Sequence, residues 1–472
     1  MQFPISLIYS LKDTEYTTLL LEIIDHTSIE YYRTLGFSTS FLEVLSNNIE
    51  KKENIREKSM YFYESFFGSE KTIVFFPQHA TLMDDRSEAM RKIDKNTLYI
   101  PVGDFSDALE AYTLSTYTYD AFLSKKEEKT RGIFFPEKHK KKYEEQVRLL
   151  TAIIRTRDII NLPPTDSRPE EFVKYIESYP WKHFQLTVID QKWLKKLGCN
   201  LLLAVGAGSD YPPYMVILER ISEKKLDTYA LIGKGVTFDA GGLQIKPDTG
   251  MLDMKCDMSG AAGMLGVAEY LDGIENIPCN LIIGLGITEN VINGKAFKPL
   301  DIYKAYNGVT VEIHHTDAEG RLVLADVMSY VEKNYSPEHI VTMATLTGAC
   351  VYALGHDIAG IMGDDEIVIQ SLMNSKSLYE PVWRLPMNEK LKKSLKTDIA
   401  DLKNVARSEK AGSSVGWAFL SYFQGRAKLT HLDIAGPAYR ETTHGYMPKW
   451  ATGWWVKILS EYLLSLGKKP KK

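Results

Sequence analysis

The sequence predicts a two-domain α/β protein. A larger C-terminal domain is expected to have a mostly parallel central sheet flanked by helices, and a smaller N-terminal domain is expected to be mixed α/β. At 472 residues the chain exceeds what one hydrophobic core usually supports. From residue 165 onwards, short apolar runs alternate with helical patterns. Strands that are apolar on both faces are typical of a parallel sheet covered by helices.

Each predicted element follows from its own pattern. In the N-terminal part, apolar runs predict the strands 71–78, 96–103 and 131–137. The stretch 146–161 has apolar residues at helical spacing and stops before two prolines, which cannot continue a helix. In the C-terminal part we expect five strands and two long helices. The strands are 228–236, 279–287, 309–315, 339–346 and 430–436, and the helices are 259–273 and 320–335.

These elements place an N-terminal domain at 1–145, a linker helix at 146–164 and a C-terminal domain at 165–472. Hydrophobic residues make up 44% and the formal net charge is -4, so nucleic acid is not an expected partner. Four cysteines without a CxxC pair predict reduced thiols rather than disulfides. We expect neither a signal peptide nor a membrane span, and therefore a cytoplasmic protein.

Charged side chains gather after two of the predicted strands, where glycines are also frequent. They are Lys234, Asp239, Lys246, Asp257, Asp317, Glu319 and Arg321. In parallel sheets, ligands bind beyond the carboxyl ends of the strands, so this edge is where a site is expected. Glycine lets the backbone approach a ligand closely.

The charged residues that follow the predicted strand 309–315 suggest a simple geometry. If the chain stays extended past His315, then Asp317, Glu319 and Arg321 all point to one side. Two carboxylates on one face repel each other unless a proton or a cation lies between them. For this segment alone, an ordinary ion pair with Arg321 explains the pattern equally well.

Two further carboxylates shift the interpretation towards metal binding. Asp239 and Asp257 bring the number at this edge to four. Oxygen donors without cysteine suit hard or borderline divalent ions such as Mn²⁺, Mg²⁺ or Zn²⁺. Four carboxylates exceed what one ion in a catalytic site needs, so we expect two ions with bridging ligands.

The same residues carry a family resemblance. The segment HTDAEGRLVLAD closely matches the signature of the leucyl aminopeptidase family, Asn-Thr-Asp-Ala-Glu-Gly-Arg-Leu. GKGVTFDAGGLQIKP and MKCDMSGAA resemble that family's other metal-site segments at the same spacing. Further similar blocks follow in the expected order at 157–172, 205–219, 344–355, 401–404 and 431–438. The resemblance covers about 155–460 and is weak before that, where only the stretch around 109–122 contributes.

The resemblance implies a metal-dependent aminopeptidase that releases N-terminal, leucine-type residues with a two-metal-activated water. Residues 165–472 would form its metallopeptidase domain, and the smaller domain would be macro-like. The implied ligands of two divalent ions, Mn²⁺ or Zn²⁺ with Mg²⁺ or Co²⁺ as further candidates, are Lys234, Asp239, Asp257, Asp317 and Glu319. Of these, Asp239 and Glu319 would bridge. A lysine ligand has to be neutral, and the alternative for Lys234 is a salt-bridged lysine.

The resemblance also implies which residues would contact a peptide substrate with a free amino terminus. Lys246 would face the substrate carbonyl or the oxyanion, and Arg321 would hold a bicarbonate or a water cluster. Met254, Thr345 and Gly348 would line the pocket for the first side chain. A homohexamer is implied as well.

The chain departs from the family pattern at two positions. His315 replaces the asparagine of the signature, and Trp455 stands where a small residue is common. Neither change removes an implied ligand. His314 and His315 would point to opposite faces of a strand, so they are not expected to be ligands, and Cys256 is expected to point away from the site.

Three other functions stay open at this point. One is a dipeptidase of narrower, Cys-Gly type specificity. Another is a DNA-binding accessory role, which the negative net charge disfavours. The third is a scaffold without activity, which the matching ligand positions disfavour.

Overall fold

The computed structural model divides into two compact units. The first contains residues 1–151 and 442–448, and the second contains 152–441 and 449–472. The described residues are 6–8, 18–22, 26–35, 37, 42–43, 63–67, 70–75, 86–87, 89–91, 97–102, 105–125, 131–134 and 140–467, apart from 224, 376–379 and 407–409. The division falls inside helix α5 (Lys140–Asn161), which begins six residues earlier than expected. The three predicted domain ranges stay a prediction.

The described part of the first unit is built on a six-stranded sheet in the order β1-β6-β5-β2-β4-β3. Its strands are β1 (Ser6–Ile8), β2 (Thr18–Glu22), β3 (Tyr63–Phe67), β4 (Glu70–Phe75), β5 (Thr97–Ile100) and β6 (Arg131–Phe134). Neighbouring strands are parallel except for β3 and β4. The helices α1 (His26–Thr34) and α4 (Phe105–Ser115) are tied to β5 by tyrosine hydroxyls. Tyr32 donates to the Ile100 carbonyl at 3.0 Å and Tyr112 to that of Thr97 at 3.1 Å. The mixed α/β prediction is confirmed.

The second unit contains an eight-stranded sheet in the order β15-β14-β17-β13-β9-β10-β8-β7. Its strands are β7 (Gln185–Ile189), β8 (Tyr214–Arg220), β9 (Thr228–Asp239), β10 (Asn280–Asn290), β13 (His339–Ala344), β14 (Ala359–Gly363), β15 (Val382–Arg384) and β17 (Lys428–Asp433). The four central strands, from β17 to β10, are parallel to one another. Antiparallel pairs occur only towards the two edges of this sheet. The predicted, mostly parallel central sheet is confirmed.

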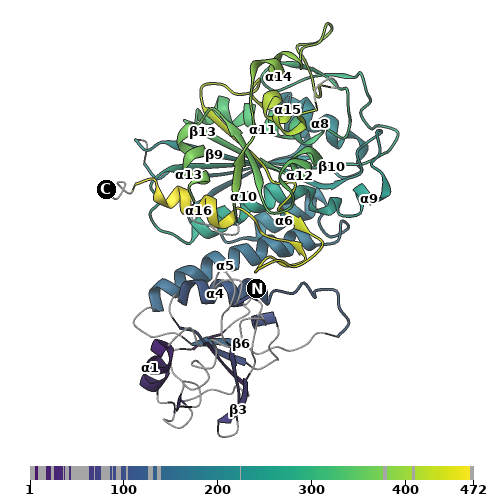
Figure 1. The fold of residues 1–472 in the computed structure, drawn as a ribbon. Coiled ribbons are helices and arrows are strands. Elements are labelled where there is room, and N and C mark those ends of the chain that lie inside the picture. Colours follow the sequence, from purple (N-terminus) through teal and green to yellow (C-terminus); the bar gives the residue numbers. More distant parts are fainter. Residues whose placement is uncertain are drawn as a thin grey trace. The chain divides into compact units, whose positions relative to one another are not determined.

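Helices cover both faces of this sheet, and Figure 1 shows α10, α11, α13 and α16 around its central strands. The helices are α6 (Pro169–Ser178), α7 (Gln191–Leu197), α8 (Asn200–Val205), α9 (Asp248–Met251), α10 (Ser259–Asp272), α11 (Gly320–Tyr335), α12 (Gly348–Leu354), α13 (Glu366–Met373), α14 (Glu389–Lys393), α15 (Gly412–Leu420) and α16 (Val456–Ser465). Two 3₁₀ helices complete the set, η3 (Gly206–Gly208) and η4 (Met254–Met258). None of the helices in the described part of the chain is long and apolar enough to cross a membrane.

Glycines in the central strands show which helix covers which face. A Cβ on Gly233 of β9 would meet the backbone of Ala261 in α10 at 2.6 Å. A Cβ on Gly284 of β10 would instead meet Val327 of α11 at 2.8 Å. Gly284 is paired with Ile232, the neighbour of Gly233, and successive residues of a strand face opposite sides. Therefore α10 and α11 pack on opposite faces.

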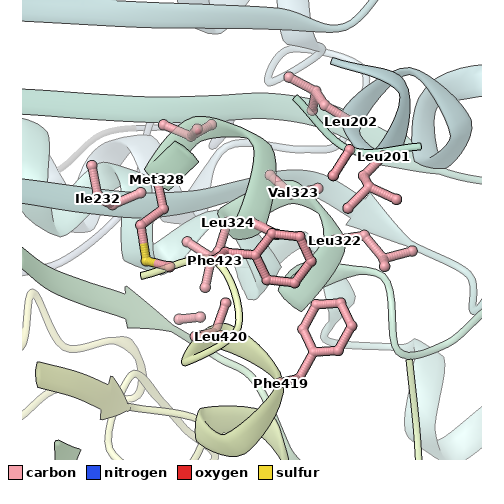
Figure 2. Packing of buried hydrophobic residues seen from close by; sticks show 14 of the residues in the cluster. Leu201, Leu202, Ile232, Leu322, Val323, Leu324, Met328, Phe419, Leu420 and Phe423 are labelled. Carbon is pink, nitrogen blue, oxygen red and sulfur yellow. The ribbon is translucent and has the colours of Figure 1, made fainter. Parts of the chain in front are cut away.

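The core on the α11 side is drawn in Figure 2. Apolar side chains from α11, β9, α8 and the segment containing α15 meet there, each almost fully buried. Those labelled are Leu201, Leu202, Ile232, Leu322, Val323, Leu324, Met328, Phe419, Leu420 and Phe423. Burying a side chain of this size stabilises the fold by about 1.5–3 kcal/mol. This core holds the first turn of α11 against the carboxyl end of the sheet.

The prediction that 309–315 forms a strand of the main sheet is wrong. Only β12 (Thr310–Glu312) is a strand, and it lies in a separate three-stranded sheet between β11 (Ile302–Lys304) and β16 (Leu402–Lys403). In the main sheet both edges of β9 are already paired, one with β13 and the other with β10. Alternation of strands and helices predicts strands, but it does not say which of them pair.

Trp455 lies immediately before α16 with φ +77°, and its side chain is fully buried. This left-handed region favours glycine, which gives a physical reason for a small residue at this position. The backbone is stabilised by Glu380, whose carboxylate accepts hydrogen bonds from Trp455 N at 3.1 Å and from Ile458 N at 2.9 Å. A short two-stranded sheet of β18 (Tyr439–Arg440) and β19 (Trp450–Ala451) precedes this helix.

Candidate metal centre

A cavity of about 390 Å³ opens at the carboxyl ends of the parallel strands. Asp239 is the last residue of β9, and Thr345 follows the last residue of β13. All ten predicted site residues line this cavity. They are Lys234, Asp239, Lys246, Met254, Asp257, Asp317, Glu319, Arg321, Thr345 and Gly348. The sequence-based prediction that they converge is therefore confirmed, whereas their individual roles stay predictions.

Lys234 projects from β9 between two carboxylates. Its Nζ lies 2.7 Å from Asp257 and 2.7 Å from Glu319, and it donates to the Thr345 carbonyl at 3.1 Å. Thr345 in turn donates its hydroxyl to Asp257 at 2.8 Å. A Cβ on Gly320 would lie 2.7 Å from two carbons of the Lys234 side chain. Glycine at 320 therefore makes room for this buried lysine at the start of α11.

Lys246 makes a second bridge between carboxylates. Its Nζ lies 2.8 Å from Asp239 and 2.5 Å from Asp317. The loop that carries Lys246 turns back on β9 because Gly241 adopts φ +89° and Lys246 N bonds to the Ala240 carbonyl at 3.0 Å. Acidic and basic groups thus alternate across the cavity, and each cation is shared by two anions.

The expected extended geometry around Asp317, Glu319 and Arg321 is wrong. Glu319 has the helical angles φ −82° and ψ −36°, and α11 begins at the next residue. Asp317 consequently reaches Lys246, Glu319 reaches Lys234, and Arg321 donates to the Asn404 carbonyl at 2.8 Å. The three side chains come together in the cavity because a tight turn and a helix start separate them, rather than because they share one face of a strand.

Burial raises the pKa values of three of the carboxyl groups. It raises the pKa of Asp239 to about 7, with a further contribution from the negative charge of Glu319. The pKa of Asp257 is raised well above its ordinary value, and that of Asp317 is raised as well. Removing carboxylates from water disfavours their charged forms, so this cluster needs a compensating positive charge.

The pKa of Glu319 is shifted in the opposite direction. Burial alone would raise its pKa, but Lys234 and Lys246 outweigh burial and lower the pKa to about 2. The two lysines show the reciprocal effect, because burial would lower their pKa values and the surrounding carboxylates raise them. Burial lowers the pKa of Arg321 to about 10, which leaves its guanidinium charged at neutral pH.

The donor set fits divalent cations. Carboxylate oxygens of Asp239, Asp257 and Glu319 lie within 4.8 Å of one another, and all three residues are buried. Asp257 Oδ2, Asp317 Oδ1 and Glu319 Oε1 accept no well-aligned hydrogen bond from the described residues. Each faces a lysine ammonium instead, at 2.7, 2.5 and 2.7 Å. Converging buried oxygens of this kind are the ligands that Mn²⁺, Mg²⁺ and Zn²⁺ use in proteins.

One residue at the cavity, Cys256, differs from expectation. Cys256 was expected to point away from the site, on the assumption of an extended chain, and that is wrong: it lies in the 3₁₀ helix η4 and lines the cavity. Burial raises the pKa of its thiol, which keeps the sulfur protonated. His315 also lines the cavity, and its Nδ1 accepts from Asp317 N at 3.2 Å. His314 instead lies 3.1 Å from Glu312.

Sequence reasoning missed two buried polar residues near the carboxylates. Asn290 donates to Asp239 at 2.8 Å and to the Thr316 carbonyl at 3.1 Å. Asp433 accepts hydroxyl hydrogen bonds from Thr347 at 2.7 Å and Ser413 at 2.8 Å. Asn290 and Asp433 are the last residues of β10 and β17. A buried polar residue at the carboxyl end of a parallel strand is the signal that could have identified them.

Comparisons with known proteins agree on one family. The family model described as "Cytosol aminopeptidase family, catalytic domain" matches residues 154–460. A "Probable cytosol aminopeptidase" of Persephonella marina is 38% identical over 368 residues, which cover 76% of this chain and 73% of that one. The one of Protochlamydia amoebophila is 39% identical over 374 residues, with 76% and 74% covered.

Solved structures show the same likeness across nearly the whole chain. The bottromycin maturation enzyme BotP superposes with a TM-score of 0.82 at 25% identity, covering 96% of this chain and all of its own. A second BotP structure is described as a complex with Mn. The cytosol aminopeptidase from Coxiella burnetii superposes with a TM-score of 0.81 at 25% identity, covering 96% and 98%.

Proposed function

Because the chain belongs to the cytosol, or leucyl, aminopeptidase family, we propose that it uses two divalent metal ions to release leucine-type residues from the amino termini of peptides. Membership of the family makes it a metal-dependent exopeptidase that acts on peptides. The number of ions, the preference for apolar residues and the role of each side chain are the proposed part. The observation that carries the proposal is the buried cluster of carboxylates at the carboxyl end of the parallel sheet.

In this proposal five side chains hold the ions. They are Lys234, Asp239, Asp257, Asp317 and Glu319, with Asp239 and Glu319 as the bridging pair. Lys234 forms ion pairs with Asp257 and Glu319 in this structure, so it would have to lose its proton in order to bind an ion. Support comes from the central position of Asp239 and Glu319, which lie close to the lysines and to the other acidic groups. When bound, the ions supply Lewis acidity for the attack of water on the scissile carbonyl. Mn²⁺ and Zn²⁺ are the proposed ions, and the Mn complex of BotP favours the first.

The remaining cavity residues act on the peptide. Lys246 is proposed to donate to the substrate carbonyl oxygen as negative charge develops there, because it lines the cavity beside the proposed ligands Asp239 and Asp317. Arg321, charged and buried, is proposed to hold a bicarbonate or a water cluster. Met254, Thr345 and Gly348 line the cavity wall, and we propose that they contact the first side chain. Restriction to the first residue is proposed to follow from its free amine, which in its neutral form could bind one of the ions, whereas an internal peptide nitrogen could not.

Assembly and location extend the proposal on family grounds alone. We infer a homohexamer in the cytoplasm, because family resemblance implies both. A narrower dipeptidase of Cys-Gly type remains the alternative specificity, and the cavity wall supports the broader, apolar preference. Leu346 and Val351 line the same cavity as Met254 and add to its apolar character.

The decisive experiment compares three substrates. Leucyl p-nitroanilide is expected to be hydrolysed in the presence of Mn²⁺ or Zn²⁺, whereas its N-acetylated form is not. The dipeptide Cys-Gly tests the alternative of a narrower dipeptidase specificity. Glu319→Ala is expected to abolish hydrolysis at every metal concentration, because it removes a bridging carboxylate. Equal cleavage of the free and acetylated amides would reject the exopeptidase, and full activity of Glu319→Ala would reject the assignment of the bridge.

A further inference from the structure

The segment that carries two of the four carboxylates does not follow a strand of the main sheet. It follows β12, which is paired in parallel with only two residues of β16, Leu402 and Lys403. Asp317 and Glu319 lie beyond the end of that short ladder. Some other contact has to hold the chain from 313 to 319 in place, because α11 begins only at Gly320.

Asn290, Gln244 and Gly241 hold Thr316 within this segment. The side chain of Asn404 holds the residues on either side of it. Asn404 directly follows β16 and is fully buried. Its Oδ1 accepts from His314 N at 2.7 Å and from His315 N at 3.2 Å. Its Nδ2 donates to the His315 carbonyl at 2.6 Å and to the Ala318 carbonyl at 3.3 Å. One carboxamide therefore makes four hydrogen bonds to the backbone of a five-residue segment.

The main chain of Asn404 reinforces the arrangement. Its N–H donates to the Glu312 carbonyl at 3.1 Å and continues the ladder of β12 and β16 by one bond. Its carbonyl accepts from Arg321 in the first turn of α11 at 2.8 Å. Asn404 thus contacts the chain before, within and after the segment that carries the acidic groups.

Only a carboxamide of this length satisfies all four backbone groups. Asparagine offers two donors and an acceptor with two lone pairs, whereas an ionised aspartate can only accept. The bonded peptide groups flank Asp317, and the Ala318 carbonyl belongs to the peptide unit that leads into Glu319. A backbone shift at these groups would move both carboxylates away from Asp239.

On the basis of the proposed metal site, we propose that Asn404 is a positioning residue of the metal centre: its carboxamide fixes the backbone at 314–318 and thereby sets Asp317 and Glu319 opposite Asp239. It does not touch the ions or the substrate. Residues that orient metal ligands from outside typically change metal affinity about 10–100-fold when they are replaced.

The chain contains a matched control in Asn280, at the opposite end of the sheet at the start of β10. This carboxamide is also buried and clamps a loop in the same pattern. Its Oδ1 accepts from Ser222 N at 2.8 Å and from Glu223 N at 3.1 Å. Its Nδ2 donates to the carbonyls of Glu223 and Leu226, both at 2.8 Å. Replacing either asparagine with alanine removes four equivalent hydrogen bonds, but only Asn404 lies beside the acidic groups.

The test measures Mn²⁺ binding to the metal-free, full-length chain by equilibrium dialysis, together with its thermal unfolding. Asn404→Ala is expected to raise the Kd for Mn²⁺ about 10–100-fold. Asn280→Ala should lower the unfolding temperature by a similar amount and leave this Kd within about twofold of wild type, since its four lost bonds are equivalent in kind. Hydrolysis of leucyl p-nitroanilide by Asn404→Ala should recover as Mn²⁺ is raised, which a general loss of stability would not produce.

The outcomes separate this inference from the proposed function. If Asn404→Ala binds Mn²⁺ as tightly as wild type, or if Asn280→Ala weakens binding equally, Asn404 is not a positioning residue. If wild-type protein binds no Mn²⁺, the proposed metal site itself is refuted. Should Asn404→Ala not fold, Asn404→Ser is compared with Asn280→Ser under the same expectations, because serine keeps one hydrogen-bonding group in the clamp.

Discussion

A methyl group at residue 320 is expected to disable the site while the fold survives. Gly320 is the first residue of α11, and a Cβ built there lies 2.7 Å from Cδ and Cε of Lys234 and 2.8 Å from its Nζ. Carbon atoms in contact normally lie about 3.5–4.0 Å apart, so the end of the Lys234 side chain would have to move by roughly 1 Å. It is buried and held at 2.7 Å by both Asp257 and Glu319. Any such movement therefore separates it from at least one carboxylate.

The size of the effect differs between folding and activity. Gly320 does not adopt a positive φ, and alanine is favoured over glycine in a helix by up to about 1 kcal/mol. That gain offsets part of the strain, so Gly320→Ala should unfold within a few degrees of wild type. A displacement of about 1 Å at a reacting centre can cost about 10²-fold in rate. We therefore expect kcat/KM for leucyl p-nitroanilide with Mn²⁺ to fall about 100-fold.

Gly294→Ala is the control for this experiment. It adds the same methyl group at an exposed position where a Cβ meets no atom within 4 Å. Its kcat/KM should equal that of wild type. If Gly320→Ala kept kcat/KM within about twofold of wild type while folded, then the position of the Lys234 side chain would not matter, and the reasoning that places it in the site would be refuted.

Two further predictions concern stability. Leu324→Ala, in the core of Figure 2, should lower the free energy of unfolding in urea by about 2–5 kcal/mol. Ile367→Ala, on the exposed side of α13, should change it little, and equal losses would contradict the placement of the core. Burial raises the pKa of Glu269 to about 7 despite its ion pair with Arg155, so the folded state binds this proton more tightly than the unfolded chain does. Stability should therefore decline as pH rises from about 4.5 to 7, by at most about 3 kcal/mol, and Glu269→Gln should lack this decline. An identical pH profile in the variant would show that Glu269 ionises normally.

Much of the fold follows from local patterns. The strands β9, β10, β13 and β17 are apolar on both faces, and that pattern alone predicts buried parallel strands whose carboxyl ends meet at one edge. The same rule places Asp239 and Asp257 near each other. Every residue that the sequence analysis assigned to the site lines the cavity. Lys234 and Asp239 lie in β9, and Glu319 and Arg321 lie at the start of α11, two elements that the sequence predicts.

Pairing between distant segments could not be predicted in this way. Whether β12 joins the main sheet depends on which edges are already occupied, and its hydrogen bonds go to β16, about ninety residues further along the chain. The turn at Glu319 likewise depends on packing α11 against β9 and β10. Asn290 carries the signal of a buried polar residue at the end of a parallel strand. Asn404 lies in the block 401–404, but nothing local shows that its side chain reaches 314–318, about ninety residues earlier in the chain.

The sequence by itself determined the types of the elements, the edge of the sheet at which the site lies and the charged side chains in it. Those depend on periodicity and on the chemistry of single residues, which are both local. Only the tertiary structure decided the path of 313–319 and the sharing of each lysine between two carboxylates. It also decided which side-chain amides hold the acidic segments in place. These are contacts between segments far apart in the chain, and their geometry is set by how the whole unit packs.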